Sequence, residues 1–407
     1  MECIICKADQ ETSKEEIFKA IPCTHEYHES CLLSWGNISN NKKCCYCTKE
    51  ITNFPKNSSD LIEACINGNL EVVRELLKNG RLNPSEPDND PLRVAASHGY
   101  LEIVKELLKD SRVDPSFIDN APIIYASRRG HVEVVKELLK DSRVDPAYFD
   151  NQAIFWASES DRLEVVKELL KDPRVDPIGT IIRTSQLGHL EVVKELLKDS
   201  RVDPSEDNNE AIIQASGSGH LEVVKELLKD SRVDPSDQYN KAIILASIFG
   251  HEEIVKELLK DSRVDPSLDS NRAFIGACRN GYVEVVRELL KDPRVDPADE
   301  IHKAIRLASG RGHLEVVKEL LKDPRVDPVY YDNEAIRVAS EFGHLEVVKE
   351  LLKDPRVDPT DFKNQALRKA LENDHFNVVV VLLKDPRVNS KNDDSYLEKY
   401  IKYINSK

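Results

Sequence analysis

The sequence predicts a mostly α-helical solenoid of about eleven helix-pair units, with a small and separate module at its N-terminus. One phrase, LEVVKELLKDPRVDP with small variations, returns along most of the 407 residues. Repetition at a fixed period of this length indicates units that each pack only on their neighbours. Seven of the nine cysteines lie within the first 47 residues, which sets this end of the chain apart.

The N-terminal module, residues 1–52, holds potential metal ligands at short, regular spacings. In a reducing compartment, cysteines and histidines clustered in this way indicate metal binding rather than disulfides. Eight ligands make two tetrahedral sites, and zinc prefers thiolate and imidazole. Cys45 could compete with Cys44, but a C-x2-C pair that ends at Cys47 favours Cys44. The predicted ligands are Cys3, Cys6, Cys23, His25, His28, Cys31, Cys44 and Cys47.

Two structural Zn²⁺ ions would also explain how so short a module folds. About fifty residues bury too little apolar surface for a stable core, whereas one structural zinc contributes on the order of 10 kcal/mol or more. We therefore expect the module to be unfolded without zinc. A catalytic zinc is not expected, because eight ligands leave no open position for water.

The ligand order resembles the RING-H2 class of RING finger, which has histidine at its fourth and fifth ligand positions. RING fingers recruit a ubiquitin-loaded conjugating enzyme and promote direct transfer of ubiquitin to a substrate lysine. The resemblance implies that Ile5 and Trp35 form the apolar groove for that enzyme; the alternative is that both are ordinary core residues. It also implies interleaved sites, one made by Cys3, Cys6, His28 and Cys31 and the other by Cys23, His25, Cys44 and Cys47.

Two positions depart from the RING pattern. The family often has proline after the seventh ligand, where this chain has Cys45, and Arg or Lys just after the eighth, where it has Thr48 followed by Lys49. The basic residue orients ubiquitin for transfer. These departures are compatible with docking of the conjugating enzyme and slow transfer.

After a linker at 53–57, the repeats occupy residues 58–390. The phrase begins at eleven positions from Leu70 to Phe376, every 31 residues, except that 27 residues separate Leu163 from Leu190. The unit at 173–190 is therefore shortened. Within the unit at 209–230, two apolar groups fit helical spacing. We expect Asn209 to cap the first helix and Gly219 to end it in a left-handed conformation.

The units resemble ankyrin repeats in their order of short helix, Gly-His turn and longer apolar helix. The unit is about two residues shorter than the typical 33, and the usual Thr-Pro-Leu-His start is replaced by variants such as Asn-Glu-Ala-Ile. The 31-residue phrase resembles the repeats of expanded ankyrin families of large DNA viruses, although repeats can be amplified in any genome. Residues 391–407 are predicted to form a closing, capping helix.

Positions that vary between otherwise constant units indicate where a protein substrate could bind. Exposed aromatic residues are typical anchors of protein interfaces; alternatively, each packs beside its own repeat. The recurrent histidines, such as His131, lie in one turn of the scaffold, so we expect a structural role for them. Variable loop aromatics also include Phe117, Tyr239 and Phe362. The substrate-binding candidates are Tyr125, Trp156, Tyr148, Phe149, Tyr330 and Tyr331.

The two resemblances together imply a RING-type ubiquitin ligase without a catalytic nucleophile, whose partners are a conjugating enzyme, ubiquitin and an unknown protein substrate. The alternative is a non-catalytic ankyrin scaffold with a structural RING-like zinc domain. A net charge of -15, with 7 Lys or Arg against 8 Asp or Glu in the first 56 residues, argues against a nucleic-acid partner. No apolar run approaches the roughly 20 residues of a membrane span. We expect an intracellular, cytoplasmic protein with no membrane partner, in the host cytoplasm if the source is viral.

Overall fold

The computed structural model describes residues 17–19, 26–28, 58–78, 82–85 and 90–388. The chain divides into two compact units, Met1–Asp176 and Pro177–Lys407, and each is considered by itself. In the first, β1 (Ile17–Lys19) pairs antiparallel with β2 (Glu26–His28), with Ile17 opposite His28. The linker at 53–57 and the closing helix at 391–407 lie outside the described residues, so both remain predictions.

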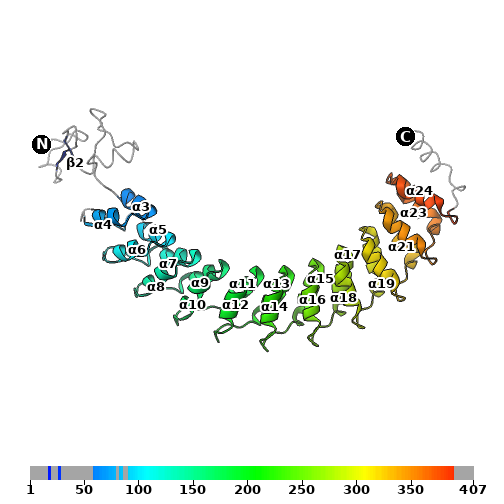
Figure 1. The fold of residues 1–407 in the computed structure, drawn as a ribbon, viewed down its shortest axis with the longest axis horizontal. Helices are drawn as coiled ribbons and strands as arrows, with labels where there is room; N and C mark the ends of the chain where they lie inside the picture. The colour runs from blue at the N-terminus through cyan, green and yellow to red at the C-terminus, as the bar shows by residue number, and fades with distance from the viewer. Residues whose placement is uncertain (1–16, 20–25, 29–57, 79–81, 86–89, 389–407) are drawn as a thin grey trace. The chain divides into compact units, whose positions relative to one another are not determined.

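The described residues form 22 helices in eleven pairs, as the sequence predicts for the fold class (Figure 1). The second helix of every pair begins where the repeated phrase begins, from Leu70 to Phe376. In the first unit the helices are α3 (Ser58–Ile66), α4 (Leu70–Lys78), α5 (Asp90–His98), α6 (Leu101–Leu108), α7 (Phe117–Arg129), α8 (Val132–Leu139), α9 (Tyr148–Glu159) and α10 (Leu163–Leu170).

The second unit continues the alternation of first and second helices. Its helices are α11 (Thr180–Leu187), α12 (Leu190–Leu196), α13 (Glu206–Ser218), α14 (Leu221–Leu227), α15 (Asp237–Phe249), α16 (Glu252–Leu258), α17 (Leu268–Asn280), α18 (Val283–Leu290), α19 (Asp299–Gly310), α20 (Leu314–Lys322), α21 (Tyr330–Glu341), α22 (Leu345–Lys353), α23 (Asp361–Glu372) and α24 (Phe376–Lys384).

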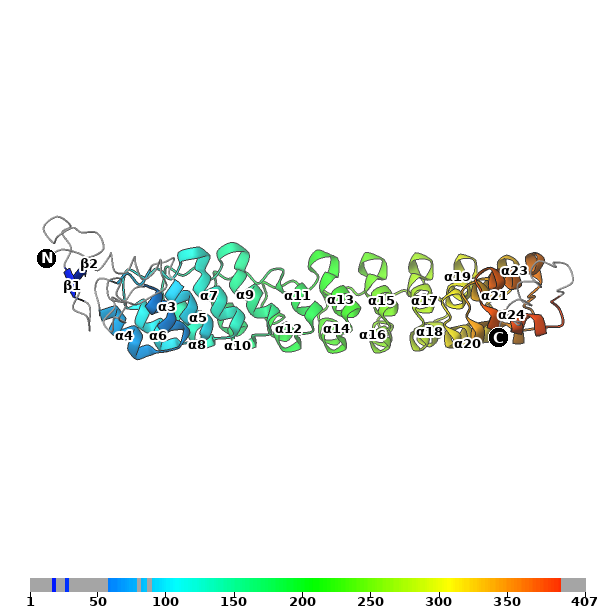
Figure 2. The same ribbon diagram turned by 90° about the horizontal axis from the view of Figure 1, so that it is seen from above.

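Within each unit the odd-numbered first helices form one layer and the even-numbered second helices form another (Figure 2). The layers meet through the apolar face of each second helix, as in α14, where Val223, Val224 and Leu227 are at most 1% exposed. Ala215 on α13 is fully buried, and so small a side chain lets neighbouring first helices approach closely. The amphipathic pattern of the phrase thus buries one continuous core along each stack.

The first helices end as the sequence predicts, but they do not begin as it predicts. Gly219 ends α13 with a φ of 85°, as predicted, and Asp161 and Asp374 adopt the same left-handed region in their repeats. The prediction that Asn209 caps its own helix is wrong, because Asn209 itself is left-handed and its side chain bonds elsewhere. It closes a left-handed turn of three residues, Asp207 to Asn209, that enters the helix.

The shortened repeat lacks this entry turn. α11 has 8 residues against 13 in α13, and it begins directly after Gly179, which is itself left-handed with a φ of 77°. The four missing residues are therefore taken from the entry to the first helix. None of the helices in the described segments is long and apolar enough to cross a membrane.

Candidate functional site

The predicted metal ligands lie almost entirely outside the described residues. Only His28 is in a described element, at the end of β2; the other seven ligands, together with Ile5 and Trp35, are not, so the two zinc sites and the docking groove stay predictions. The donor set itself fits zinc, because thiolate and imidazole are the ligands that zinc prefers. Among the described residues, no group of three or more His, Cys, Asp or Glu side chains could hold a metal ion.

The two cysteines of the repeats have the properties of core residues. Cys65 and Cys278 are both fully buried and are not in a disulfide. Burial raises the pKa of the Cys65 thiol to about 12, and it also raises the pKa of the Cys278 thiol. Both therefore remain protonated thiols at neutral pH, and neither is suited to nucleophilic chemistry.

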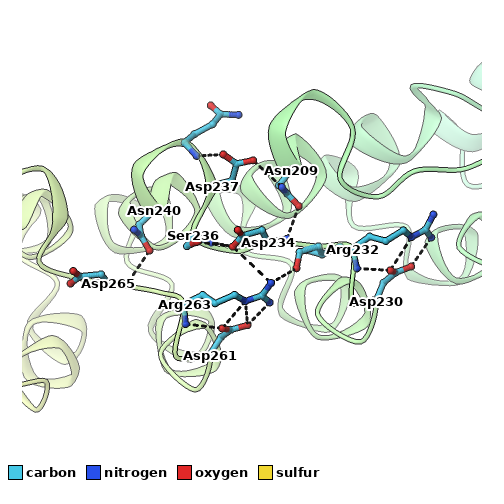
Figure 3. A network of polar contacts seen from close by, with 12 residues as sticks. Asn209, Asp230, Arg232, Asp234, Ser236, Asp237, Asn240, Asp261, Arg263 and Asp265 are labelled. Atoms are coloured by element: carbon cyan, nitrogen blue, oxygen red, sulfur yellow. Dashed lines mark hydrogen bonds and ion pairs between the residues drawn. The ribbon is translucent and has the colours of Figure 1, made fainter.

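A polar turn follows the second helices, and in several repeats, such as those of Arg232 and Arg263, its arginine also bonds to the preceding repeat (Figure 3). After α16, the carboxylate of Asp261 accepts hydrogen bonds from the backbone N–H and the side chain of Arg263, the latter at 3.0 and 2.7 Å. Nη1 of Arg263 donates to the carbonyl oxygen of Val233, 30 residues earlier, and lies 3.9 Å from the carboxylate of Asp234. Arg232 makes the same bonds to Asp230 and to Val202. The guanidinium group thus links its own turn to the turn of the preceding repeat.

The asparagine that ends the entry turn forms a second link in several repeats, and in α19 the link is made by His302. Oδ1 of Asn209 accepts a hydrogen bond at 2.7 Å from the backbone N–H of Asp234, 25 residues later, and Asn240 does the same for Asp265 (Figure 3). The carboxylate of Asp234 in turn accepts from the N–H and hydroxyl of Ser236. These bonds fix the turn that leads into the next first helix.

The recurrent histidines form a third link, which gives them the structural role expected from the sequence. Nε2 of His131 lies 3.1 Å from the carbonyl oxygen of Ser97, 34 residues earlier. Because a carbonyl only accepts, this nitrogen must carry the proton. The His131 ring also lies against Gly99, where a Cβ atom would be 2.5 Å from Nδ1. Burial lowers the pKa of His131, which favours the neutral ring.

These links hold the first helices in register, and the exposed side of those helices carries the candidate residues of the first unit. The guanidinium carbon of Arg93 on α5 lies 5.6 Å from the ring centroid of Tyr125 on α7. One repeat later, that of Arg128 lies 4.5 Å from the Trp156 ring. Tyr125 is 39% exposed and Trp156 is partly buried. The structure therefore joins Tyr125 and Trp156 into a row of arginine–aromatic pairs.

The arginines of this row were not among the residues predicted from the sequence. The role of Arg93 and Arg128 was not predictable from local sequence, because each stacks on an aromatic residue of the following repeat, about thirty positions away. The available signal was the variation at the repeat position of Arg128, which holds Ile248, Arg279 or Glu341 elsewhere. A cation over an aromatic face contributes about 0.5–1 kcal/mol at exposed sites, so these arginines also stiffen the surface.

The remaining candidates lie at the entry turns rather than on the helix face. Tyr148 is half-exposed and its hydroxyl donates to Asp119 at 2.7 Å, so this side chain packs partly on the neighbouring repeat. Phe149, with a φ of 50°, is 64% exposed. In the second unit, the Tyr330 ring lies 4.9 Å from that of His302, whereas Tyr331 is 67% exposed.

Phe149 and Tyr331 are therefore bulky residues that a strained, left-handed turn holds in solvent. Such strain is concentrated at binding surfaces, where the fold holds it in place. Tyr239, in the same kind of turn, is 80% exposed. The turns thus present aromatic side chains that their own repeats do not cover.

Comparison with protein families agrees with both parts of the chain. A family model for ankyrin repeats matches residues 38–119, 111–178, 181–272, 231–301 and 301–392. A model for the C3HC4-type zinc finger, or RING finger, matches residues 3–47. This chain has His28 where the C3HC4 order has cysteine. No curated protein matches the chain.

Proposed function

The chain belongs to the ankyrin-repeat proteins, with a RING finger ahead of its repeats, and from this premise we propose that it is a RING-type ubiquitin ligase. Its RING finger would dock a ubiquitin-loaded conjugating enzyme, and its repeats would capture a protein substrate. The observation that carries the proposal is the RING match at residues 3–47 in the same chain as a repeat surface with exposed aromatic side chains.

Two zinc ions are the expected cofactors. The series from Cys3 to Cys47 supplies eight thiolate or imidazole donors, enough for two closed tetrahedral sites of the RING-H2 kind. Bound zinc would tie together distant parts of the short module and so hold Ile5 and Trp35 in place for the conjugating enzyme. We place this activity in the cytoplasm, where reducing conditions keep these cysteines as thiols.

The ligase would act by positioning alone. Transfer runs directly from the conjugating enzyme to the substrate lysine, so this chain needs no nucleophile and its contribution is orientation. In the first unit, substrate would contact the arginine–aromatic row that includes Tyr125 and Trp156 and the exposed entry-turn residue Phe149. In the second unit, the exposed entry-turn residue Tyr331 would offer a separate contact. Tyr148 and Tyr330 would support them, since each packs on a neighbouring repeat.

A second candidate function is a scaffold that binds protein without promoting transfer. Cys45 and Thr48 favour it, because RING ligases often have proline and a basic residue at these positions. The two functions share the repeats and differ only in the activity of the RING finger.

An autoubiquitination assay with a panel of conjugating enzymes separates the two functions. The ligase predicts ubiquitinated product, which the Ile5→Ala and Trp35→Ala variants should lose while they keep their zinc. Thr48→Arg should accelerate transfer, because it restores a donor that orients ubiquitin. A zinc-loaded protein that gives no product with any conjugating enzyme would be a scaffold.

Zinc removal tests the cofactor proposal separately. Elemental analysis should find about two zinc ions per chain, and chelation should unfold the N-terminal module because each structural ion contributes on the order of 10 kcal/mol or more. The helical circular dichroism of the repeats should survive, since the described repeats hold no metal cluster. Fewer than about two ions in freshly purified protein would contradict the paired sites.

A further inference from the structure

A groove of about 480 Å³ lies among α15, α17 and α19 in the second unit. Gly276, in the middle of α17, forms part of its wall, together with Ile248 and Leu307. The same repeat position holds Tyr125 or Leu245 elsewhere. A Cβ atom at residue 276 would lie 2.6 Å from Cγ1 of Ile248. The glycine therefore lets the Ile248 side chain pack against α17, and a larger residue at position 276 would displace this part of the groove wall.

The groove is strongly basic although the chain is acidic. It is lined by one carboxylate, Asp269, and by four cations, Arg272, Arg279, Lys303 and Arg311, in a protein of net charge -15. Asp269 forms an ion pair with Arg272 at 2.9 Å. Within the described part of the chain, Arg279 and Arg311 are exposed and have no ion-pair partner. Two guanidinium groups are thus available to a ligand.

The neighbouring repeats neutralise the charges on their first helices. Nζ of Lys241 on α15 lies 3.5 Å from the carboxylate of Glu210 on α13. On the other side, Nε of Arg306 on α19 lies 3.3 Å from that of Glu334 on α21. The repeat position of Glu210, Lys241 and Glu334 holds Arg272 on α17 and Lys303 on α19. At this repeat position the groove therefore has two basic residues and no acidic one.

We propose that the groove binds an acidic segment of a partner protein. Carboxylates of the segment would accept hydrogen bonds from Arg279 and Arg311, while an apolar side chain would occupy the space beside Gly276, between Ile248 and Leu307. Arginine suits this role because its planar fork matches a carboxylate. This inference rests on the proposed role of the repeats in binding protein, and it does not depend on ligase activity.

A nucleic acid fits the groove less well than a peptide. A volume of 480 Å³ holds a few side chains, and the acidic residues Glu210 and Glu334 flank it on the adjoining helices. An extended phosphate backbone would meet these carboxylates and the overall negative charge, whereas a short acidic segment need only span the basic stretch.

Fluorescence polarisation with a labelled octaglutamate peptide tests the proposal on the full-length, zinc-loaded protein. The double variant Arg279→Glu/Arg311→Glu should weaken binding by about tenfold or more, since charge reversal replaces two attractions by repulsions. The matched control is Arg129→Glu, because Arg129 occupies the repeat position of Arg311 on α7, away from the groove. This control should change the affinity by less than about twofold. Octaglutamine should not bind.

Filling the groove provides a test without a change of charge. Gly276→Leu should weaken peptide binding, whereas Gly217→Ala, a helical glycine on α13 outside the groove, should not. Circular dichroism must show unchanged helix content in both variants.

Three results would overturn the proposal: no binding of octaglutamate, equal losses in the Arg129→Glu control, or displacement of the peptide by a single-stranded oligonucleotide at lower concentration than by unlabelled peptide. Because ubiquitin is absent from these assays, a failure here leaves the ligase proposal untouched, and an inactive RING finger leaves the groove untouched.

Discussion

At the scale of single residues, the fold depends on glycines that stand against the side chain of the next repeat. Gly312 has a φ of 77°, and a Cβ atom there would lie 2.5 Å from Nδ1 of His344. The same histidine donates through Nε2 to the carbonyl oxygen of Gly310 at 3.0 Å. The position of the His344 ring therefore requires a left-handed residue without a side chain at position 312.

Replacing Gly312 with alanine should destabilise the protein by about 1–2 kcal/mol from the left-handed conformation alone, and further from the clash with the His344 ring. Urea unfolding followed by circular dichroism would measure the change. The control is Gly310→Ala, two residues earlier. That glycine is helical, and its added Cβ would make a tight contact of 3.3 Å with Val338 instead of a clash at 2.5 Å, so a smaller loss is expected there. Equal losses in the two variants would contradict this account.

Some of these residue roles were predictable from the sequence and others were not. The conformation of Gly219 was predictable, because a left-handed glycine commonly ends a helix. The role of Asn209 was not, because its partner is the backbone N–H of Asp234, 25 residues away. Local capping rules describe only bonds within one turn of helix, and here the neighbouring repeat supplies the better partner.

At the scale of elements, arginine side chains link the turns that follow the second helices. Arg263 combines a fork to Asp261 with a hydrogen bond to the carbonyl of Val233. Arg294 makes the equivalent fork to Asp292, but within the described residues it makes no equivalent bond to the preceding turn. The two arginines thus share the hydrogen bonds within their own turn, and only Arg263 adds a hydrogen bond between repeats.

Arg263→Ala should therefore cost more stability than Arg294→Ala. The expected difference is about 1 kcal/mol, the usual net value of one hydrogen bond. Denaturant midpoints of the two variants, measured side by side, would reveal it. If the two midpoints agreed, the bond to Val233 would contribute nothing to coupling between repeats.

The helix pairs were predictable from the sequence because their apolar period repeats eleven times. The entry turns were not, since residues such as Ile118 and Phe149, with φ values of 49° and 50°, rarely adopt a left-handed conformation. Likewise, the groove at Gly276 depends on which side chains three neighbouring helices bring together. Variation at one repeat position indicates a surface but not its shape.

At the scale of the whole molecule, acid should weaken all the turns together. Hydrogen bonds from the following arginine hold the pKa of each turn aspartate, such as Asp230, Asp261 and Asp323, below its ordinary value of 3.8. The unfolded chain then binds protons more readily than the folded one. This stabilisation is fully present above about pH 4 and is lost as the pH falls through the lowered pKa values.

We therefore expect the urea midpoint to fall steeply below about pH 4. Asp261→Asn should lower the midpoint at pH 6 and reduce the difference between pH 6 and pH 3, because it removes one of the titrating groups. An unchanged difference would mean that these carboxylates do not govern acid unfolding.

The repeated bonds also bear on how such a chain changes length over generations. Within each unit, neighbouring repeats meet through bonds that span 25, 30 or 34 residues, as at Asn240, Arg263 and His251. Unequal recombination that gains or loses one 31-residue segment would preserve the same kinds of bond at most of the remaining interfaces between repeats. The gene can thus gain, lose or reorder repeats without requiring a new kind of interface between them. Each new repeat also brings its own exposed side chains to the surface that binds a partner.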